Sequence, residues 1–429
     1  MRLSAALTGG VLAAALAAIS PSRAASNPDK ILAAMKTIPP IEFVVRTGAP
    51  NACGPSCDSW IAAEGLIDER AAARLRRVLD TVGSRKLPVF FYSPGGDTAQ
   101  GLAIGRMLRK RGLSAGVAVT VPEGCMRSHE VDDCRALMRR APQAEAALLL
   151  DGASCNSSCA YAILGAVKRE IAPTALLGVH SGYSYLSFAS PQTTQRQRAQ
   201  AIERGRQRVA REVQRYLAEM AIDRELFRLA SETKFESLHV LTRAELFDLG
   251  IDRREVADSG WHVSDLSASS LGNSMLTTLV EKENGGPATD FRQIALAISC
   301  AAAQPGNYKV TTIALVPDAA AAASQTDIHL ASDAVDLRLP AADSARRTGN
   351  GKTYEVRQGQ WPRPMIETLL LANPTISFVE TPRDAQSTQQ DQRAAASTRH
   401  PLSSLAAESS LHALAARCTA GQLSPTRSA

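Results

Sequence analysis

The sequence predicts an α/β domain followed by a smaller, mainly β domain. Between about residues 40 and 255, buried-type strands alternate with amphipathic helices, which is the rhythm of a mostly parallel sheet. Later in the chain, residues 308–316, 334–339 and 353–357 show the period-two pattern of half-buried antiparallel strands. With 429 residues the chain is long enough for two domains.

The composition argues against nucleic-acid binding. Aromatic residues make up 4% of the chain, which is sparse for a protein that stacks bases or sugars. The net charge of +6 comes from 48 basic and 42 acidic residues spread along the chain rather than gathered in a basic segment. We therefore expect no nucleic-acid partner.

Residues 1–25 predict an exported protein. Arg2 gives this segment a positive start, residues 7–19 are apolar and rich in alanine, and Ala24 and Ala25 suit a cleavage site. No later apolar run reaches the roughly 18 to 20 residues that a membrane span requires. We expect a signal peptide cleaved near Ala24 and Ala25, and a periplasmic or secreted protein without a membrane span.

The first domain is expected at 38–262. Its strands are predicted at 41–45, 60–63, 88–92, 113–121, 147–150 and 176–179, and its helices at 98–110, 158–168 and 191–220. A further helix begins after Asp68, a candidate cap, and Thr242 and Glu245 form a capping-box pattern at the last helix. Residues 122–147, which carry charge, proline and two cysteines, form an inserted excursion.

The second domain is expected at 289–420, after a linker at 263–288 that contains Glu-Asn-Gly-Gly-Pro. Residues 381–400 are rich in Gln, Ser, Thr and Ala, which is typical of a loop. Residues 402–418 predict a closing helix. A bridge between Cys300 and Cys418 would attach this helix to the first strand of the domain.

Eight cysteines predict disulfides, because paired thiols in exported proteins tend to oxidise. Three local pairs stand out, and they are Cys53 with Cys57, Cys125 with Cys134, and Cys155 with Cys159. Eight cysteines allow about 105 pairings, so the spacing does not determine the connectivity. Zinc held by Cys125, His129 and Cys134 is the alternative, although this spacing fits no common ligand pattern.

Two glycines follow a predicted strand in the turn Ser93-Pro94-Gly95-Gly96-Asp97. Glycine reaches backbone conformations closed to other residues, and the N–H groups of such a turn can point beyond the strand end and bind an oxyanion. A plain turn without chemistry is the alternative.

A pair of serines, Ser157 and Ser158, lies at the start of a small-residue helix, within Cys-Asn-Ser-Ser-Cys. A serine at this position usually caps the helix, whereas a nucleophile also needs a base and donors for the tetrahedral intermediate. His180 follows the next strand, 23 positions after Ser157 (180 − 157). A lone histidine there is more often structural, but the order of turn, serine and histidine predicts one site.

This order of motifs resembles the Clp-type serine peptidases of the ClpP/crotonase superfamily, and more closely their exported members, whose serine lies in a Cys-x-Ser-x-Cys setting. The resemblance covers about residues 40 to 255 and is carried by Trp60–Asp68, Phe91–Gly96, Ser157–Ala166, Gly178–His180 and Leu241–Ile251. It implies a repeated ββα spiral and a serine peptidase acting on peptides or proteins. It is compatible with a homo-oligomer, and we expect no cofactor and no metal.

Carried onto this sequence, the resemblance makes Ser157 the nucleophile. His180 would take its proton and later return it to the leaving group. The backbone N–H groups of Gly95 or Gly96, together with that of Ser158, would face the oxyanion.

The third catalytic member departs from the family pattern. Where the family has an aspartate, the gap-free count reaches Lys234, and Glu232 and Glu236 are the neighbouring candidates. A non-catalytic ClpP-like scaffold or binding protein of the cell envelope, with a degenerate site, is therefore the alternative function. The excursion at 122–147 precedes the nucleophile turn and is expected to cover the cleft or to mediate assembly.

Overall fold

The structure is a computed structural model of the whole chain. It describes residues 28–123, 125, 131–141, 143–182, 194–265, 274–283, 289–301, 304, 306–316, 326–339, 345–349, 352–371, 376–382, 398–402 and 407–420. The expected signal peptide, His129 and most of the expected loop at 381–400 lie outside these residues. None of the helices among these residues combines the length and the apolar surface that a membrane span requires.

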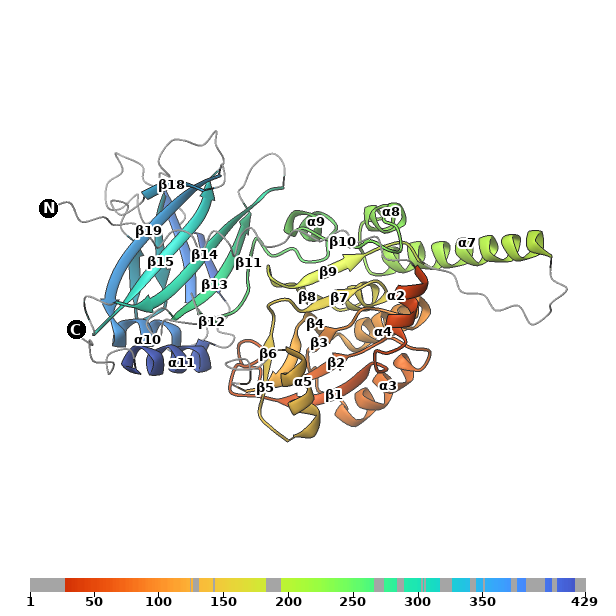
Figure 1. Cartoon of the computed structure of the whole chain (residues 1–429), viewed down its shortest axis with the longest axis horizontal. Coiled ribbons are helices and arrows are strands. Elements are labelled where there is room, and N and C mark those ends of the chain that lie inside the picture. Colours follow the sequence, from red (N-terminus) through yellow and green to blue (C-terminus); the bar gives the residue numbers. More distant parts are fainter. Residues whose placement is uncertain are drawn as a thin grey trace, which may run out of the picture.

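A five-stranded sheet organises the first domain (Figure 1). Its order is β1-β2-β3-β4-β8, with β1 antiparallel to β2 and all other neighbours parallel. The strands are β1 Glu42–Thr47, β2 Ser59–Glu64, β3 Val89–Tyr92, β4 Ser114–Val117 and β8 Lys168–Glu170. The prediction of a mixed α/β domain with a mostly parallel sheet is confirmed.

Alternating residues of β2 face two different layers. Ile61 and Ala63 join the main core, with the apolar faces of helices α3 (Ala71–Val82) and α4 (Thr98–Arg111). Trp60 and Ala62 point to the opposite face, into a smaller core with residues of the excursion. The sheet therefore has helices on one face and the excursion on the other.

Helix α3 begins differently from the prediction. Its N-cap position is Arg70, and no side chain caps it. Asp68, the expected cap, accepts a hydrogen bond from the Arg70 N–H at 3.3 Å and forms an ion pair with Arg74. Helix α4, in contrast, is capped by the Asp97 side chain and ends at Gly112 in the left-handed conformation.

The strand predicted at 113–121 divides at Ala118. β4 stays in the main sheet, whereas β5 (Val119–Pro122) pairs with β6 (Ala146–Leu149) in a separate two-stranded sheet. Helix α5 (Val131–Arg140) lies between β5 and β6 in the chain. The expected excursion is thus a compact unit of two strands and one helix.

A three-stranded sheet, of order β10-β9-β7, carries the predicted serine and histidine. Its strands are β7 Ser154–Asn156, β9 Leu176–Val179 and β10 His239–Val240. Helix α6 (Ser158–Leu164) follows β7 and is shorter than predicted. It ends where Gly165 packs on α4 so closely that a Cβ would lie 1.9 Å from the Gly105 carbonyl oxygen.

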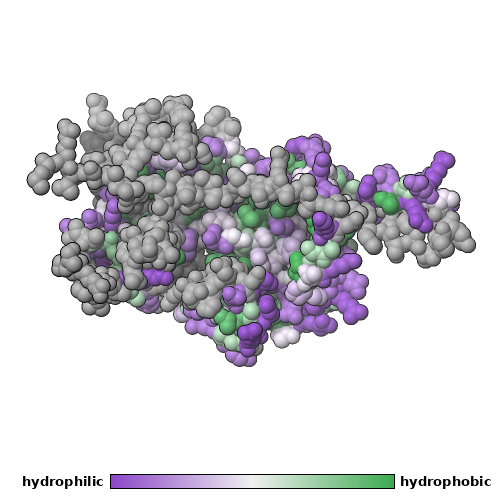
Figure 2. All heavy atoms as spheres, viewed as in Figure 1, coloured by the Kyte–Doolittle hydropathy of each residue, from purple (hydrophilic) through white to green (hydrophobic). Residues whose placement is uncertain are grey.

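The remaining described helices of the first domain are α2 Pro28–Met35, α7 Gln195–Glu219, α8 Glu225–Glu232 and α9 Arg243–Asp248. The predicted capping box of Thr242 and Glu245 begins α9. Helix α7 extends away from the body, and hydrophilic residues cover most of its visible face (Figures 1 and 2). Its buried residues, Val213, Tyr216 and Leu217, all lie in the C-terminal half, so the N-terminal half has no buried residue.

Most of the described residues after Val256 lie in two antiparallel sheets. One sheet has the order β11-β13-β14-β15-β19-β18, with β12 also paired to β13, and the other has the order β17-β16-β20-β21. The strands are β11 Val256–Asp258, β12 His262–Asp265, β13 Ser274–Glu283, β14 Phe291–Cys300, β15 Asn307–Val316, β16 Thr326–Ala331, β17 Asp336–Leu339, β18 Ala345–Gly349, β19 Lys352–Pro362, β20 Ile376–Pro382 and β21 Thr398–Leu402. Helices α10 (Arg363–Leu371) and α11 (Ala407–Ala420) pack on each other beside the sheets (Figure 1).

Strands β12 and β13 lie within the segment expected as a linker, 263–288. Leu276 and Val280 of β13 are fully buried in the core of the second domain, where they pair with residues of β14. The prediction of a linker over 263–288 is therefore wrong for residues 274–283, because burial of Leu276 and Val280 and pairing with β14 make this segment a strand.

Helix α9 contacts the residues that lead into β14. The Phe291 ring, at the start of β14, lies 5.8 Å from the Phe247 ring and 5.3 Å from the Arg243 guanidinium. Thr289 Oγ1 donates a hydrogen bond to Asp248 at 2.6 Å.

All eight cysteines form disulfides, in the four pairs named from the sequence: Cys53–Cys57, Cys125–Cys134, Cys155–Cys159 and Cys300–Cys418. The prediction of oxidised cysteines is confirmed. The zinc alternative is wrong, because the sulfurs of Cys125 and Cys134 are bonded to each other. Cys300–Cys418 attaches α11 to β14.

Candidate functional site

Ser157 occupies a tight turn between strand β7 and helix α6. Its backbone has φ 58° and ψ −122°, in the region that favours glycine. Holding a serine there costs on the order of 1–3 kcal/mol, which the surrounding structure must offset. The Ser157 side chain makes no capping hydrogen bond, although it stands at the N-cap position of α6. The common capping role of a serine is therefore not seen, and the hydroxyl remains available.

His180 directly follows β9, the parallel neighbour of β7. Asn156 pairs with Gly178 across these strands, and the Ser157 N–H donates to the Gly178 carbonyl oxygen at 2.8 Å. Ser157 and His180 thus lie one and two residues beyond the same register pair, at the same end of adjacent strands. No hydrogen bond links their side chains in the described part of the chain.

The carbonyl group of Ser181 determines the tautomer of His180. Nδ1 lies 2.9 Å from the Ser181 carbonyl oxygen, and because a carbonyl only accepts, Nδ1 carries the proton. Nε2 then has a free lone pair, as a general base requires. The ring packs edge-on against Phe235 at 5.2 Å.

Burial lowers the pKa of His180 below its ordinary value. The Ser181 carbonyl and the negative charge of Glu236 act in the opposite direction and are outweighed. Since a buried imidazolium is poorly solvated, the neutral ring is favoured. The group is therefore in the form that can accept a proton at neutral pH.

The two candidate acids differ in their relation to His180. Glu232 is exposed at the end of α8, where it forms an ion pair with Arg228. Glu236 is partly buried, and its charge influences His180, but it makes no hydrogen bond with the ring. The Nδ1 position, where a triad acid would bind, is taken by the Ser181 carbonyl. No sequence pattern identifies a backbone carbonyl in this role.

The glycine turn lies directly beside Ser157. Ser93 bridges to Cys155: its N–H donates to Ser154 at 2.9 Å, and its carbonyl accepts from Asn156 at 3.0 Å. A Cβ on Gly95 would lie 2.7 Å from the Ser157 Cβ. Only glycine therefore lets the turn come this close.

The three backbone N–H groups proposed for the oxyanion differ in their bonding. The Gly95 N–H donates to Ser93 Oγ at 3.1 Å. The Gly95 carbonyl accepts from Ile67 N, so the Gly96 N–H, on the opposite side of the same trans peptide, points away from Ile67. Within the described residues, the N–H groups of Gly96 and Ser158 donate no hydrogen bond. These two donors are free next to the serine.

Arg135 of α5 connects the excursion to the carboxyl ends of the main-sheet strands, from which the glycine turn begins. Its Nε lies 3.2 Å from Glu64, the last residue of β2, and its guanidinium stacks 4.9 Å from the Tyr92 ring at the end of β3. Glu64 also accepts from the Thr120 N–H at 2.7 Å. Helix α5 is therefore fixed at the carboxyl ends of β2 and β3, one residue from the glycine turn.

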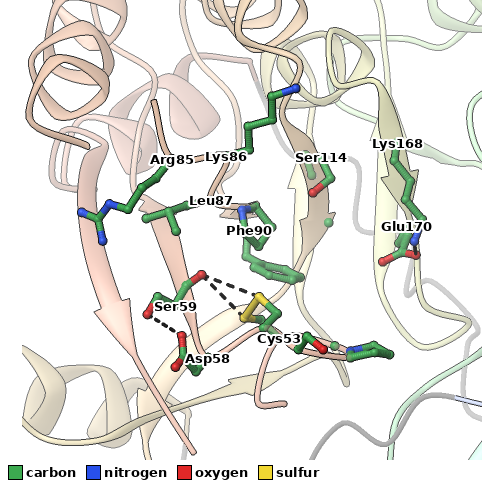
Figure 3. Close-up of a pocket in the computed structure, with 17 residues that line it drawn as sticks. Cys53, Asp58, Ser59, Arg85, Lys86, Leu87, Phe90, Ser114, Lys168 and Glu170 are labelled. Atoms are coloured by element: carbon green, nitrogen blue, oxygen red, sulfur yellow. Dashed lines mark hydrogen bonds and ion pairs between the residues drawn. A yellow bond between two sulfur atoms is a disulfide. The ribbon is translucent and has the colours of Figure 1, made fainter. Parts of the chain in front are cut away.

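The larger of two described pockets lies elsewhere. It has a volume of about 490 Å³ and lies at the start of β2, β3 and β4, between the Cys53–Cys57 loop and β8 (Figure 3). Phe90 lines it, and Lys168 and Glu170 form an ion pair at 2.6 Å on its wall. A second pocket, of about 130 Å³, lies between β1 and α5. Neither pocket is lined by Ser157 or His180.

No known protein family and no curated protein matches the chain. Among solved structures, the chain is similar to a ClpP1 mutant from Listeria monocytogenes, with 18% identity, a TM-score of 0.27, and coverage of 44% of this chain and 85% of that chain. A likeness of this size does not show the family or the activity of the chain.

Proposed function

We propose that the chain is an exported ClpP-like serine hydrolase, most simply a peptidase. The observation that supports this most directly is the conformation of Ser157, whose positive φ presents an uncapped hydroxyl beside the His180 strand. The order of the five ClpP-like sequence motifs adds to it. The repeated ββα spiral that these motifs imply for residues 38–262 is part of the same proposal. The proposal that the substrate is a peptide or protein is based on that sequence resemblance alone.

In this proposal Ser157 Oγ attacks the carbonyl carbon of the substrate. Its proton moves to His180 Nε2, which later delivers it to the leaving amine. The developing oxyanion is met by the N–H groups of Gly96 and Ser158, since the Gly95 N–H is occupied by Ser93. Removing one such donor typically costs about 10² to 10³ in turnover.

The alternative is a ClpP-like scaffold without catalysis, which binds proteins or the cell envelope. Two observations favour it: no carboxylate bonds to His180, and no hydrogen bond joins His180 to Ser157 in the described residues. Catalytic hydrogen bonds are often long before substrate binds, so the second observation weighs less than the first.

Labelling with a fluorophosphonate separates the two functions. The activated Ser157 Oγ would bond to phosphorus and expel fluoride, while His180 accepts the hydroxyl proton. Wild type should be labelled, and Ser157→Ala and His180→Ala should not. Labelling that is lost in Ser158→Ala but kept in Ser157→Ala would place the nucleophile one residue later. An unlabelled, folded wild type would support the scaffold.

Export and assembly complete the proposal. Four intramolecular disulfides are consistent with an oxidising compartment, and we propose that residues 1–25 direct the protein to the periplasm or outside the cell. We assign binding or assembly to the C-terminal domain, and homo-oligomerisation belongs to the same proposal. Free-thiol titration of the denatured, unreduced secreted protein should find almost no free thiol.

A further inference from the structure

A disulfide encloses the candidate nucleophile symmetrically. Cys155 lies two residues before Ser157 on β7, Cys159 lies two residues after it in the first turn of α6, and their sulfurs are bonded. Their Cα atoms are 5.2 Å apart. Four extended residues would span roughly 13 Å, so the intervening chain must turn back sharply.

The strained residue stands at the centre of this short ring. Asn156 is held on the strand side by its hydrogen bond to Ser93, and Ala160 on the helix side by its bond to the Ser157 carbonyl at 3.0 Å. Between these anchors, Ser157 alone has a positive φ. A covalent link between strand and helix therefore restrains the one residue whose conformation is unfavourable.

Both cysteines are inaccessible. Cys155 and Cys159 have 0% exposed surface and lie in the main core. A reductant cannot reach the bond in the closed protein, so its location suits a permanent restraint rather than a redox switch.

We propose that the Cys155–Cys159 disulfide is a positioning element that holds Ser157 in its positive-φ conformation. Without it, the turn relaxes to negative φ, and the serine hydroxyl turns toward the free N–H groups of α6 as an ordinary cap. The catalytic meaning of this restraint rests on the proposed hydrolase function, but the conformational claim does not.

The conformational claim is tested without any activity, by comparing glycine with alanine at position 157. At positive φ glycine is the more stable residue, whereas at negative φ alanine is, because glycine loses more entropy on folding. With the disulfide intact, Ser157→Gly should melt at a higher temperature than Ser157→Ala. In the Cys155→Ala/Cys159→Ala background the order should reverse. An unchanged advantage of glycine in both backgrounds would show that the rest of the fold holds the turn, and would overturn the proposal.

The matched control is the other disulfide of the same spacing. Cys53–Cys57 also joins residues four apart, with Cα atoms 5.1 Å apart, but it lies in a surface loop. In a Cys53→Ala/Cys57→Ala background, glycine should keep its advantage at position 157. If the buried alanine pair is too unstable to measure, Cys155→Val/Cys159→Ala refills the lost volume and serves in its place.

Labelling then connects the restraint with function. With Ser157 present, removal of Cys155–Cys159 should slow fluorophosphonate labelling by on the order of 10²-fold, as expected for a misplaced nucleophile. Removal of Cys53–Cys57 should change it less than about twofold. If wild type is not labelled at all, the hydrolase proposal fails while the glycine–alanine comparison still decides the role of the disulfide.

Discussion

The ring of His180 is oriented by a backbone carbonyl: Nδ1 lies 2.9 Å from the Ser181 oxygen. The Ser181 N–H in turn donates to the Thr233 carbonyl at 2.8 Å, which ties the residue after His180 to the segment after α8. A carbonyl fixes the tautomer as a carboxylate does, but it carries no full charge with which to stabilise an imidazolium. His180 can therefore act as a base without the electrostatic help of a triad acid.

The first prediction concerns the pH dependence of labelling. Only the neutral ring accepts the Ser157 proton, and burial holds the pKa of His180 below its ordinary value of 6.5. The labelling rate should therefore rise with pH, with a midpoint below 6.5, and reach a plateau above it. Rate measurements from pH 4.5 to 8.5 test this. A midpoint clearly above 6.5 would show that an acid stabilises the imidazolium after all.

The second prediction separates the two candidate acids. The charge of Glu236 raises the pKa of His180, whereas Glu232 is engaged with Arg228. Glu236→Gln should therefore move the midpoint of the labelling profile further down, and Glu232→Gln, the matched control, should leave it in place. If Glu236→Gln abolished labelling across the whole pH range, Glu236 would be a true triad member that approaches the ring only when substrate is bound.

The third prediction concerns the close approach of the glycine turn. Gly95→Ala would place a Cβ 2.5 Å from the Asn156 carbonyl oxygen at a φ of 101°, so both a clash and a strained backbone result. We expect a loss of about 2–4 kcal/mol in the free energy of unfolding and loss of labelling.

Gly54→Ala is the matched control for Gly95→Ala. Gly54 has a similar φ of 113°, but a Cβ there would meet nothing within 4 Å. It should cost only the backbone strain, on the order of 1 kcal/mol, and leave labelling intact. Denaturant unfolding of both variants measures the difference. Equal losses would mean that the contact with Asn156 and Ser157 adds nothing.

Much of the site was predictable because its residues follow strands. Ser157 and His180 each come directly after a strand, and parallel neighbours bring such ends together, as the pairing of Asn156 with Gly178 does here. The orienting partner of His180 was not predictable, because a backbone carbonyl has no sequence signal. The sequence also could not show that the Gly95 N–H is occupied while the Gly96 N–H is free, because this depends on the position of Ser93 Oγ.

The fold errors have a common physical origin in tertiary contacts. The predicted helix runs to residue 168, but α6 ends at Leu164, where Gly165 packs on Gly105, and Lys168 already begins strand β8, which pairs with β4. Strand β13 was not predicted because it directly precedes the linker-like residues Glu-Asn-Gly-Gly-Pro, although Leu276 and Val280 are buried in the core of the C-terminal sheets. In both places the local pattern was ambiguous, and long-range pairing decided the outcome.

The last prediction concerns the order in which the disulfides are reduced in the folded protein. Cys53 and Cys57 are partly exposed in a surface loop, whereas Cys155 and Cys159 are fully buried. Reduction requires direct attack on sulfur, so the buried pair must wait for local opening of β7 and α6. Under mild native treatment with dithiothreitol, Cys53–Cys57 should be reduced at least about tenfold faster than Cys155–Cys159. Alkylation at timed intervals, followed by peptide mass spectrometry, gives the rate for each pair. Reduction of Cys155–Cys159 first would mean that the nucleophile turn opens readily, and the disulfide would then suit a redox switch better than a fixed restraint.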